Sequence, residues 1–72
     1  MIKKARIAKG LSQKQLSKKT KISQSYLSKL EQQEFTHSPT VTQVLALSKA
    51  LNIDKVTVFL YFADKEMEFY KK

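Results

Sequence analysis

The chain has 72 residues and a net charge of +8, with no cysteine and a single histidine. This length leaves room for one small domain, so we expect a single domain over residues 1–72. The lack of cysteine excludes disulfides and thiolate metal sites, and one histidine cannot form a metal site alone. We therefore expect a cytoplasmic protein without metal or cofactor.

The positive charge is concentrated in the first half of the chain. Residues 31–72 carry five lysines against six acidic residues, whereas residues 1–30 carry no acid. The basic residues of that first segment are Lys3, Lys4, Arg6, Lys9, Lys14, Lys18, Lys19, Lys21 and Lys29. Such a segment favours a polyanion, either nucleic acid or an anionic membrane surface. The longest apolar run is VFLYFA at 58–63, so we expect no signal peptide and no membrane span.

Breaker and capping residues predict where the first helices begin and end. A first helix is expected over residues 2–9, and Gly10 provides a left-handed stop. Ser12 and Gln15 have the spacing of a capping box, which predicts a second helix up to about residue 19. Ser23 predicts the start of a third helix.

The third helix is expected to end near Gln32, with Leu27 and Leu30 on its inward face. Only residues 20–22 separate it from the second helix. A connection this short makes the two helices cross sharply, as in a helix-turn-helix. In DNA-binding proteins of this type the second of the two helices enters the major groove.

Two further helices are predicted in the second half. Thr40 and Gln43 form another capping box before an apolar helix over 41–51. Asp54 caps a fifth helix, which either runs through the last residues or breaks near Asp64. No segment alternates as a strand does, so we expect an all-α fold of five helices.

The string KKARIAKGLSQKQLSKKTKISQSYLSKLEQ resembles the Cro and phage-repressor helix-turn-helix family, the xenobiotic-response-element type of regulator. The resemblance covers about residues 2–60. It rests on Arg6, KGLSQ at 9–13, Leu16, IS at 22–23, SYLSKLE at 25–31 and SPT…ALSKALNI at 38–53. It implies a compact five-helix bundle of the lambda-repressor-like type that binds operator DNA, usually as a symmetric dimer. The segment after residue 55 would be a C-terminal helical extension.

Three positions depart from the family pattern. Lys21 occupies the turn position that is usually glycine, and we expect it to adopt a positive φ at a cost of about 1 kcal/mol. Ser17 replaces the small residue common in the middle of the second helix. The loop QEFTHS at 33–38 lacks the basic residues expected there, so backbone N–H groups and nearby hydroxyls would have to replace them.

The polar side of the third helix is the expected base-reading surface. A helical wheel separates it from the leucines, and a glutamine can bond the N6 and N7 edge of adenine in bidentate fashion. Lysine suits guanine, and serine accepts several bases. The predicted base-contacting residues are Gln24, Ser25, Ser28 and Lys29. The alternative is a merely solvated helix face.

Residues near the helix starts and in the loop are expected to contact the DNA backbone, because free N–H groups there attract phosphates. The predicted backbone contacts are Ser12, Gln13, Lys14, Ser23, Tyr26, Gln32, Thr36, Ser38 and Thr40. The resemblance implies that Gln13 and Gln24 are used jointly, and that one glutamine braces the other while its remaining donor reaches a phosphate. Tyr26 either contacts a phosphate or thymine methyl, or packs against the second helix or the following loop.

Arg6 is the only arginine of the chain. The family resemblance pairs it with Glu31 in a bidentate clamp between the first and third helices, a geometry that lysine cannot supply. We therefore interpret both residues mainly as a structural ion pair.

Five of the seven aromatic residues fall within residues 56–70. A chain this small can hardly bury all of them, so we expect either a homodimer that uses this segment or packing back onto the rest of the chain. A two-fold dimer would present two recognition helices about one DNA turn, roughly 34 Å, apart.

The sequence has no glycine-rich phosphate loop, no defined pair of catalytic carboxylates and no nucleophile with a base, so we expect no enzyme. The predicted function is a sequence-specific transcriptional regulator, most simply a dimeric repressor on an inverted-repeat operator. Two alternatives stay open. One is the antitoxin of a toxin-antitoxin pair, with the toxin or another regulator as protein partner; the other is a protein-interaction module that retains the fold.

Overall fold

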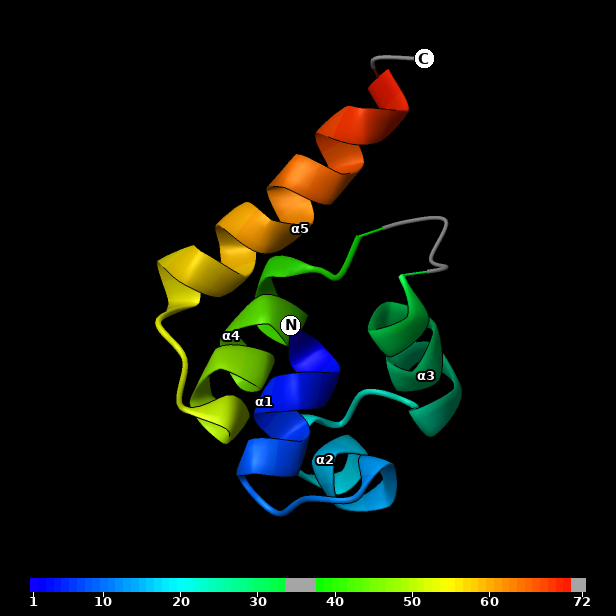
Figure 1. Ribbon diagram of the computed structural model, residues 1–72, viewed down its shortest axis with the longest axis vertical. Coiled ribbons are helices and arrows are strands. Elements are labelled where there is room, and N and C mark those ends of the chain that lie inside the picture. The colour runs from blue at the N-terminus through cyan, green and yellow to red at the C-terminus, as the bar shows by residue number, and fades with distance from the viewer. Residues whose placement is uncertain (34–37, 71–72) are drawn as a thin grey trace. The chain divides into compact units, whose positions relative to one another are not determined.

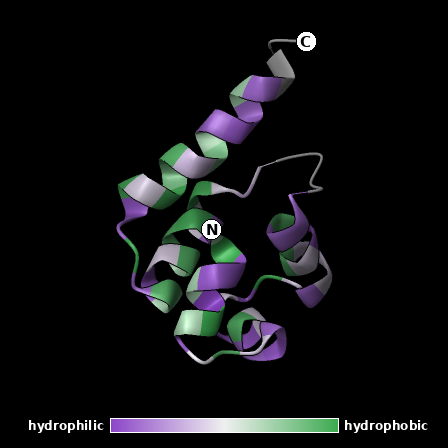
Figure 2. Cartoon of the chain, viewed as in Figure 1, coloured by the Kyte–Doolittle hydropathy of each residue, from purple (hydrophilic) through white to green (hydrophobic). Residues whose placement is uncertain are grey.

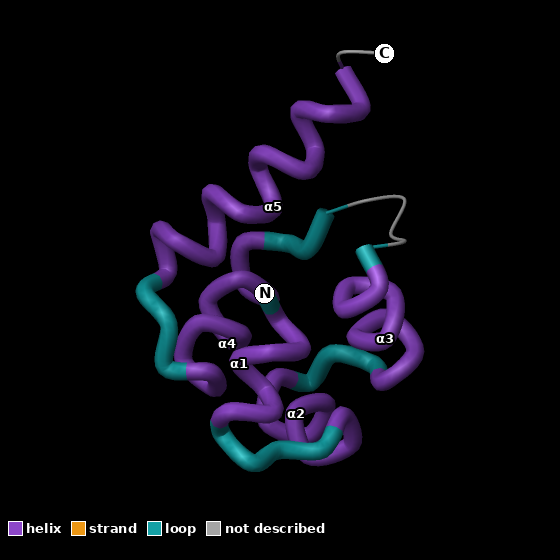
Figure 3. The backbone as a smooth tube through the Cα atoms, viewed as in Figure 1, coloured by secondary structure: helices purple, strands orange, loops and turns teal. Residues whose placement is uncertain are grey.

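The computed structural model describes residues 1–33 and 38–70, and in this part of the chain all regular structure is helical (Figure 3). The elements are α1 (Ile2–Ala8), α2 (Gln13–Thr20), α3 (Gln24–Gln32), α4 (Val41–Leu51) and α5 (Lys55–Tyr70) (Figure 1). The predicted all-α fold of five helices is confirmed. The chain divides into two units, Met1–Phe35 with α1 to α3 and Thr36–Lys72 with α4 and α5.

Side-chain caps set the starts of four helices, as predicted. Ser12 and Thr40 each accept the backbone N–H of the glutamine three residues later, whose side chain accepts the N–H of the cap in return. Ser23 accepts the N–H of Tyr26 at 3.1 Å, and Asp54 accepts two N–H groups in the first turn of α5. These bonds satisfy donors that have no partner within the helix.

Gly10 ends α1 with a left-handed turn. Its φ is +70°, its N–H donates to the carbonyl of Ile7, and the N–H of Leu11 donates to the carbonyl of Arg6. This pair of bonds is a Schellman motif, which explains why the helix stops at Ala8, one residue before the predicted end.

Lys21 adopts the predicted left-handed conformation between α2 and α3, with φ 60° and ψ 23°. The polar groups of this turn are bonded by two side chains of α2. The Ser17 hydroxyl donates to the carbonyl of Ile22 at 2.5 Å, and the Thr20 hydroxyl accepts the N–H of Ile22 at 3.3 Å. The departure at Ser17 thus provides a bond that closes the turn.

In the first unit α3 packs against both α2 and α1. Leu27 and Leu30 of α3 are 0% and 1% exposed, as the wheel predicts, and Leu16 and Ile22 are buried as well. The apolar side of α3 is therefore fully used in packing, which leaves its opposite side to the solvent.

Arg6 and Glu31 form a bidentate ion pair between α1 and α3. The guanidinium donates from Nε to Oε2 at 2.7 Å and from Nη2 to Oε1 at 3.1 Å, and Nη1 donates to the carbonyl of Leu11 at 2.8 Å. The two side chains are only 12% and 3% exposed. Because burial shields the pair from water, it joins the helices more strongly than an exposed pair would.

Burial by itself would raise the pKa of Glu31. Hydrogen bonds from Arg6 and Gln13, with the charges of Arg6 and Lys3, outweigh this effect and hold the pKa below its ordinary value. The bond to Glu31 likewise raises the pKa of Arg6. Both groups are therefore ionised at neutral pH.

In the second unit α4 packs against α5. Val44, Leu47 and Leu51 of α4 are buried, together with Val58 and Phe62 of α5. The fifth helix does not break near Asp64 but continues to Tyr70. No glycine or proline interrupts this segment. The ammonium of Lys65 lies 5.7 Å from the centre of the Tyr61 ring, and this contact across one helical turn stabilises the helix near Asp64.

Lys21→Gly should raise the free energy of unfolding relative to Lys21→Ala by about 1 kcal/mol, because glycine adopts a positive φ without steric strain. Both substitutions remove the same charge, so their difference isolates the backbone. Chemical denaturation measures it. Equal midpoints for the two variants would show that the turn is not strained.

The ion pair should make stability depend on acid pH. A lowered pKa in the folded state adds stability that is fully present above the ordinary value of 4.5 and is lost as the pH falls through the lowered value. Urea unfolding between neutral pH and about pH 3 should therefore show that the free energy of unfolding falls more steeply for wild type than for Glu31→Gln. Parallel curves for the two proteins would contradict the assignment.

Candidate nucleic-acid interface

One side of α3 is polar and open to solvent. Gln24, Ser25 and Lys29 are exposed on it, and Ser28 is half-buried, opposite Leu27. The exposed Gln32 donates its amide Nε2 to the Ser28 hydroxyl at 3.4 Å, a long bond. The structure therefore brings all four predicted base-contacting residues to one side of one helix, while the buried side fixes how that helix is rotated.

The starts of α2 and α3 combine free N–H groups with cap hydroxyls. Ser12 and Ser23 are both exposed and accept a bond from their own helix. A serine that accepts still has its hydroxyl hydrogen to donate. Both caps can thus bind an anion without releasing the helix that they start.

Gln13 is half-buried in the first turn of α2, and its amide Nε2 donates to Oε1 of Glu31 at 3.0 Å. The bond that the structure records for the Gln13 side chain thus goes to Glu31. Gln13 and Glu31 are 18 apart in the sequence. No local pattern could have predicted this contact. The joint use of Gln13 and Gln24 that the resemblance implies stays a prediction.

Tyr26 is half-buried on the flank of α3, and burial raises the pKa of its hydroxyl. The phenol is therefore neutral at physiological pH. Its position is compatible with both alternatives predicted for it, and a DNA contact by Tyr26 stays a prediction.

The remaining predicted backbone contacts lie outside the first unit or outside the described residues. Thr36 falls in 34–37, which the structure does not describe. Ser38 is half-buried in the second unit, and Thr40 is the exposed cap of α4. Their roles stay predictions.

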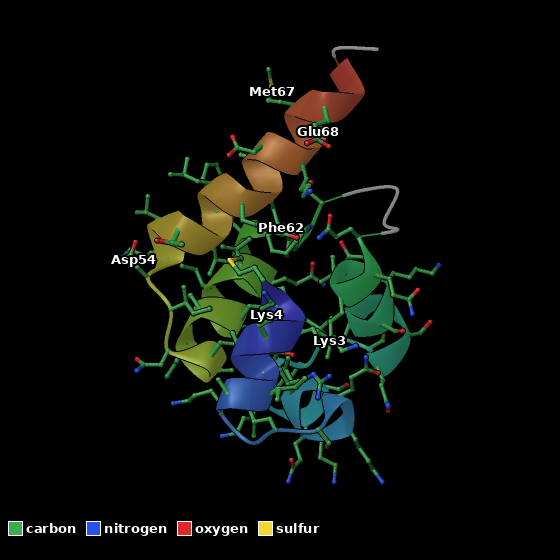
Figure 4. The ribbon with its side chains drawn as sticks, viewed as in Figure 1. Lys3, Lys4, Asp54, Phe62, Met67 and Glu68 are labelled. Carbon is green, nitrogen blue, oxygen red and sulfur yellow. The ribbon has the colours of Figure 1, made fainter. Side chains whose placement is uncertain are left out.

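The first unit has a strongly positive surface. Glu31 is the only acidic residue among residues 1–33, and Arg6 neutralises it. All lysines of this range are exposed: Lys3, Lys4, Lys9, Lys14, Lys18, Lys19, Lys21 and Lys29. Figure 2 shows the hydrophilic residues that alternate with apolar ones along α2 and α3, and Figure 4 marks Lys3 and Lys4 on α1. Such a surface attracts phosphate backbones of any sequence.

Across residues 1–33 and 38–70, no group of three or more His, Cys, Asp or Glu side chains is arranged to hold a metal ion. Within those ranges, too, no helix is both long and apolar enough to cross a bilayer.

The chain matches the family model HTH_3, described as Helix-turn-helix, over residues 2–57. Neither the curated proteins nor the solved structures gave a match. The matched range includes α1 to α4, the left-handed turn and both serine caps. The chain therefore belongs to the Cro/C1-type helix-turn-helix family, and it is a DNA-binding transcriptional regulator.

Proposed function

We propose that the protein is a cytoplasmic, sequence-specific repressor that binds an inverted-repeat operator as a homodimer and places α3 in the major groove. One observation carries this proposal. α3, the second helix of the helix-turn-helix, buries Leu27 and Leu30 and exposes its polar side to the solvent. In proteins of this type the second helix reads DNA. A bound dimer at a promoter would exclude polymerase.

Gln24 has the chemistry and the position to contact a base. It is the first residue of α3, it is exposed, and its amide can bond an adenine edge through two atoms. Lys29 would prefer guanine, while Ser25 and Ser28 would tolerate several bases. In this proposal Gln24 makes the largest contribution to sequence preference.

Affinity that does not depend on sequence would come from groups around this surface. The Ser12 and Ser23 hydroxyls, the N–H groups beside them and the Lys14 ammonium all suit phosphate oxygens. These contacts would set the register of the protein on the duplex but carry no base information.

The second unit supplies a surface for the dimer. The side of α5 that carries Val58 and Phe62 is buried, 0% and 2% exposed. The opposite side carries a second row of apolar residues at helical spacing, each about half exposed: Val56, Phe59, Leu60 and Met67. Figure 4 shows Phe62 on the side of α5 that faces α4, while Met67 points away from it. We call this second row the outer face of α5.

A groove beside the outer face also suits a protein partner. Val44, Phe59, Phe62, Ala63 and Glu66 line a groove of about 210 Å³ in the second unit. Sites for drug-sized ligands are roughly 300–1,000 Å³, so this groove fits one apolar side chain better. We propose that the outer face of a second copy supplies that side chain.

Charges along α5 favour an antiparallel arrangement of the two copies. Lys55 follows the cap Asp54 at the amino end, whereas the carboxyl half carries Asp64, Glu66 and Glu68 against one lysine, Lys65. In a parallel pair each charged residue would lie beside the same residue of the other helix, and like charges repel. In an antiparallel pair the lysine end of one helix lies beside the acidic half of the other.

Gln24→Ala should weaken binding to a cognate operator by about tenfold or more, because one bidentate base contact is lost. The operator would first be selected from a random DNA pool at physiological salt, where we expect an enriched inverted repeat. Fluorescence anisotropy with cognate and scrambled duplexes then gives the specificity ratio.

Lys14→Ala is the matched control for that experiment. It should lower the affinity for both duplexes by the same factor. The slope of log affinity against log salt concentration should become shallower by about one. A pool without enrichment, or a Gln24→Ala protein with the wild-type ratio, would contradict sequence-specific binding by α3.

Leu60→Glu should weaken the homodimer by about tenfold or more, because it buries a charge in the centre of the outer face. Sedimentation equilibrium measures the dissociation constant, and circular dichroism verifies that each variant is folded. Thr57→Glu, on an exposed flank of α5, should leave the dimer intact. A wild-type chain that is monomeric at every concentration and binds the two half-sites independently would refute the dimer.

A further inference from the structure

One carboxylate in the first unit binds two partners from different helices. Oε1 of Glu31 accepts from Arg6 Nη2 at 3.1 Å and from Gln13 Nε2 at 3.0 Å, while Oε2 accepts from Arg6 Nε at 2.7 Å. The Glu31 side chain is only 3% exposed. A residue of α3 therefore holds α1 and the first residue of α2 through the same group.

The chemistry of this group fixes which way the Gln13 amide points. An ionised carboxylate only accepts hydrogen bonds, so it can bind the NH₂ group of the amide but not its carbonyl. The inward atom of the Gln13 amide must therefore be Nε2. One N–H and the carbonyl oxygen remain for other partners.

Gln13 lies where a phosphate contact is expected. It follows the exposed cap Ser12 and begins α2, whose first N–H groups have no helical acceptor. A glutamine without a partner such as Glu31 would lose rotamer freedom when it binds a phosphate. Glu31 imposes that restriction before DNA arrives.

We propose that Glu31 is a positioning residue for DNA binding, which holds the Gln13 amide so that its second N–H is presented to one backbone phosphate. This inference rests on the DNA-binding role proposed above. It gives Glu31 a task beyond joining α1 to α3 through Arg6.

The two tasks of Glu31 can be separated, because only one of them involves Gln13. If Glu31 acts through Gln13, removing Gln13 makes the loss of the carboxylate unimportant for DNA affinity. If Glu31 only stabilises the fold, its effect on affinity is independent of Gln13. Arg6→Lys is the matched control, since it weakens the clamp but keeps the carboxylate that Gln13 binds.

The experiment is a double-mutant cycle on the affinity for the selected operator, at a temperature where circular dichroism shows every variant to be folded. Gln13→Ala and Glu31→Gln should each weaken binding by about tenfold, the value of one hydrogen bond to a charged group. The double variant should be no weaker than either single one. Arg6→Lys combined with Gln13→Ala should give the product of the two single effects.

A second measurement uses operators in which single phosphates are replaced by neutral methylphosphonates. Wild type and Arg6→Lys should lose affinity at the phosphate that Gln13 contacts, whereas Gln13→Ala and Glu31→Gln should be insensitive there. If Glu31→Gln does not fold, Glu31→Asp replaces it with the same expectation, because the shorter side chain retracts the acceptor.

Two results would overturn this inference but not the proposed function. One is that the losses of operator affinity caused by Gln13→Ala and Glu31→Gln multiply in the double variant. The other is a Glu31 variant that remains sensitive to neutralisation of the phosphate. A random pool without any enriched sequence would instead overturn the proposed function, and this inference with it.

Discussion

The buried carboxylate of Glu31 is the group on which the first unit depends. Placing a charge where only 3% of the side chain is exposed is costly unless its oxygens are bonded. Arg6 compensates the charge with two parallel bonds, and Gln13 donates a third bond, to Oε1. Removing either partner would leave a buried acceptor short of a donor, and a lysine at position 6 could not make both parallel bonds.

This arrangement links stability to the proposed interface. The starts of α2 and α3 are where a helix-turn-helix protein approaches DNA, and their separation depends on how the two helices cross. The left-handed Lys21 sets the turn between them, and the Ser17 and Thr20 hydroxyls bond the carbonyl and the N–H of Ile22, which follows it. Glu31 then fixes α1 and the beginning of α2 against α3. The exposed lysines add attraction to any duplex, whereas the proposed discrimination depends on uncharged side chains that this framework orients.

Much of the local structure could be predicted because it depends on residues three or four apart. The capping boxes at Ser12 and Thr40, the cap at Ser23 and the buried side of α3 are of this kind. The bond from Gln13 to Glu31 could not be predicted, since nothing in a spacing of 18 residues marks it. The sequence also left open whether α5 breaks near Asp64. It continues because no residue there stops a helix, and its described outer face is apolar without being buried. The wheel identified the solvent side of α3, but not how the amides on and around it are oriented.

The central claim is that the polar side of α3 contacts base edges. Intermolecular nuclear Overhauser effects between the protein and the selected operator test it most directly, with the protein isotope-labelled and the DNA unlabelled. The account predicts contacts from Gln24, Ser25 and Ser28 side chains to major-groove protons, such as cytosine H5 and thymine methyl groups. Contacts from these residues to sugar protons alone, or base contacts only from residues outside α3, would contradict it.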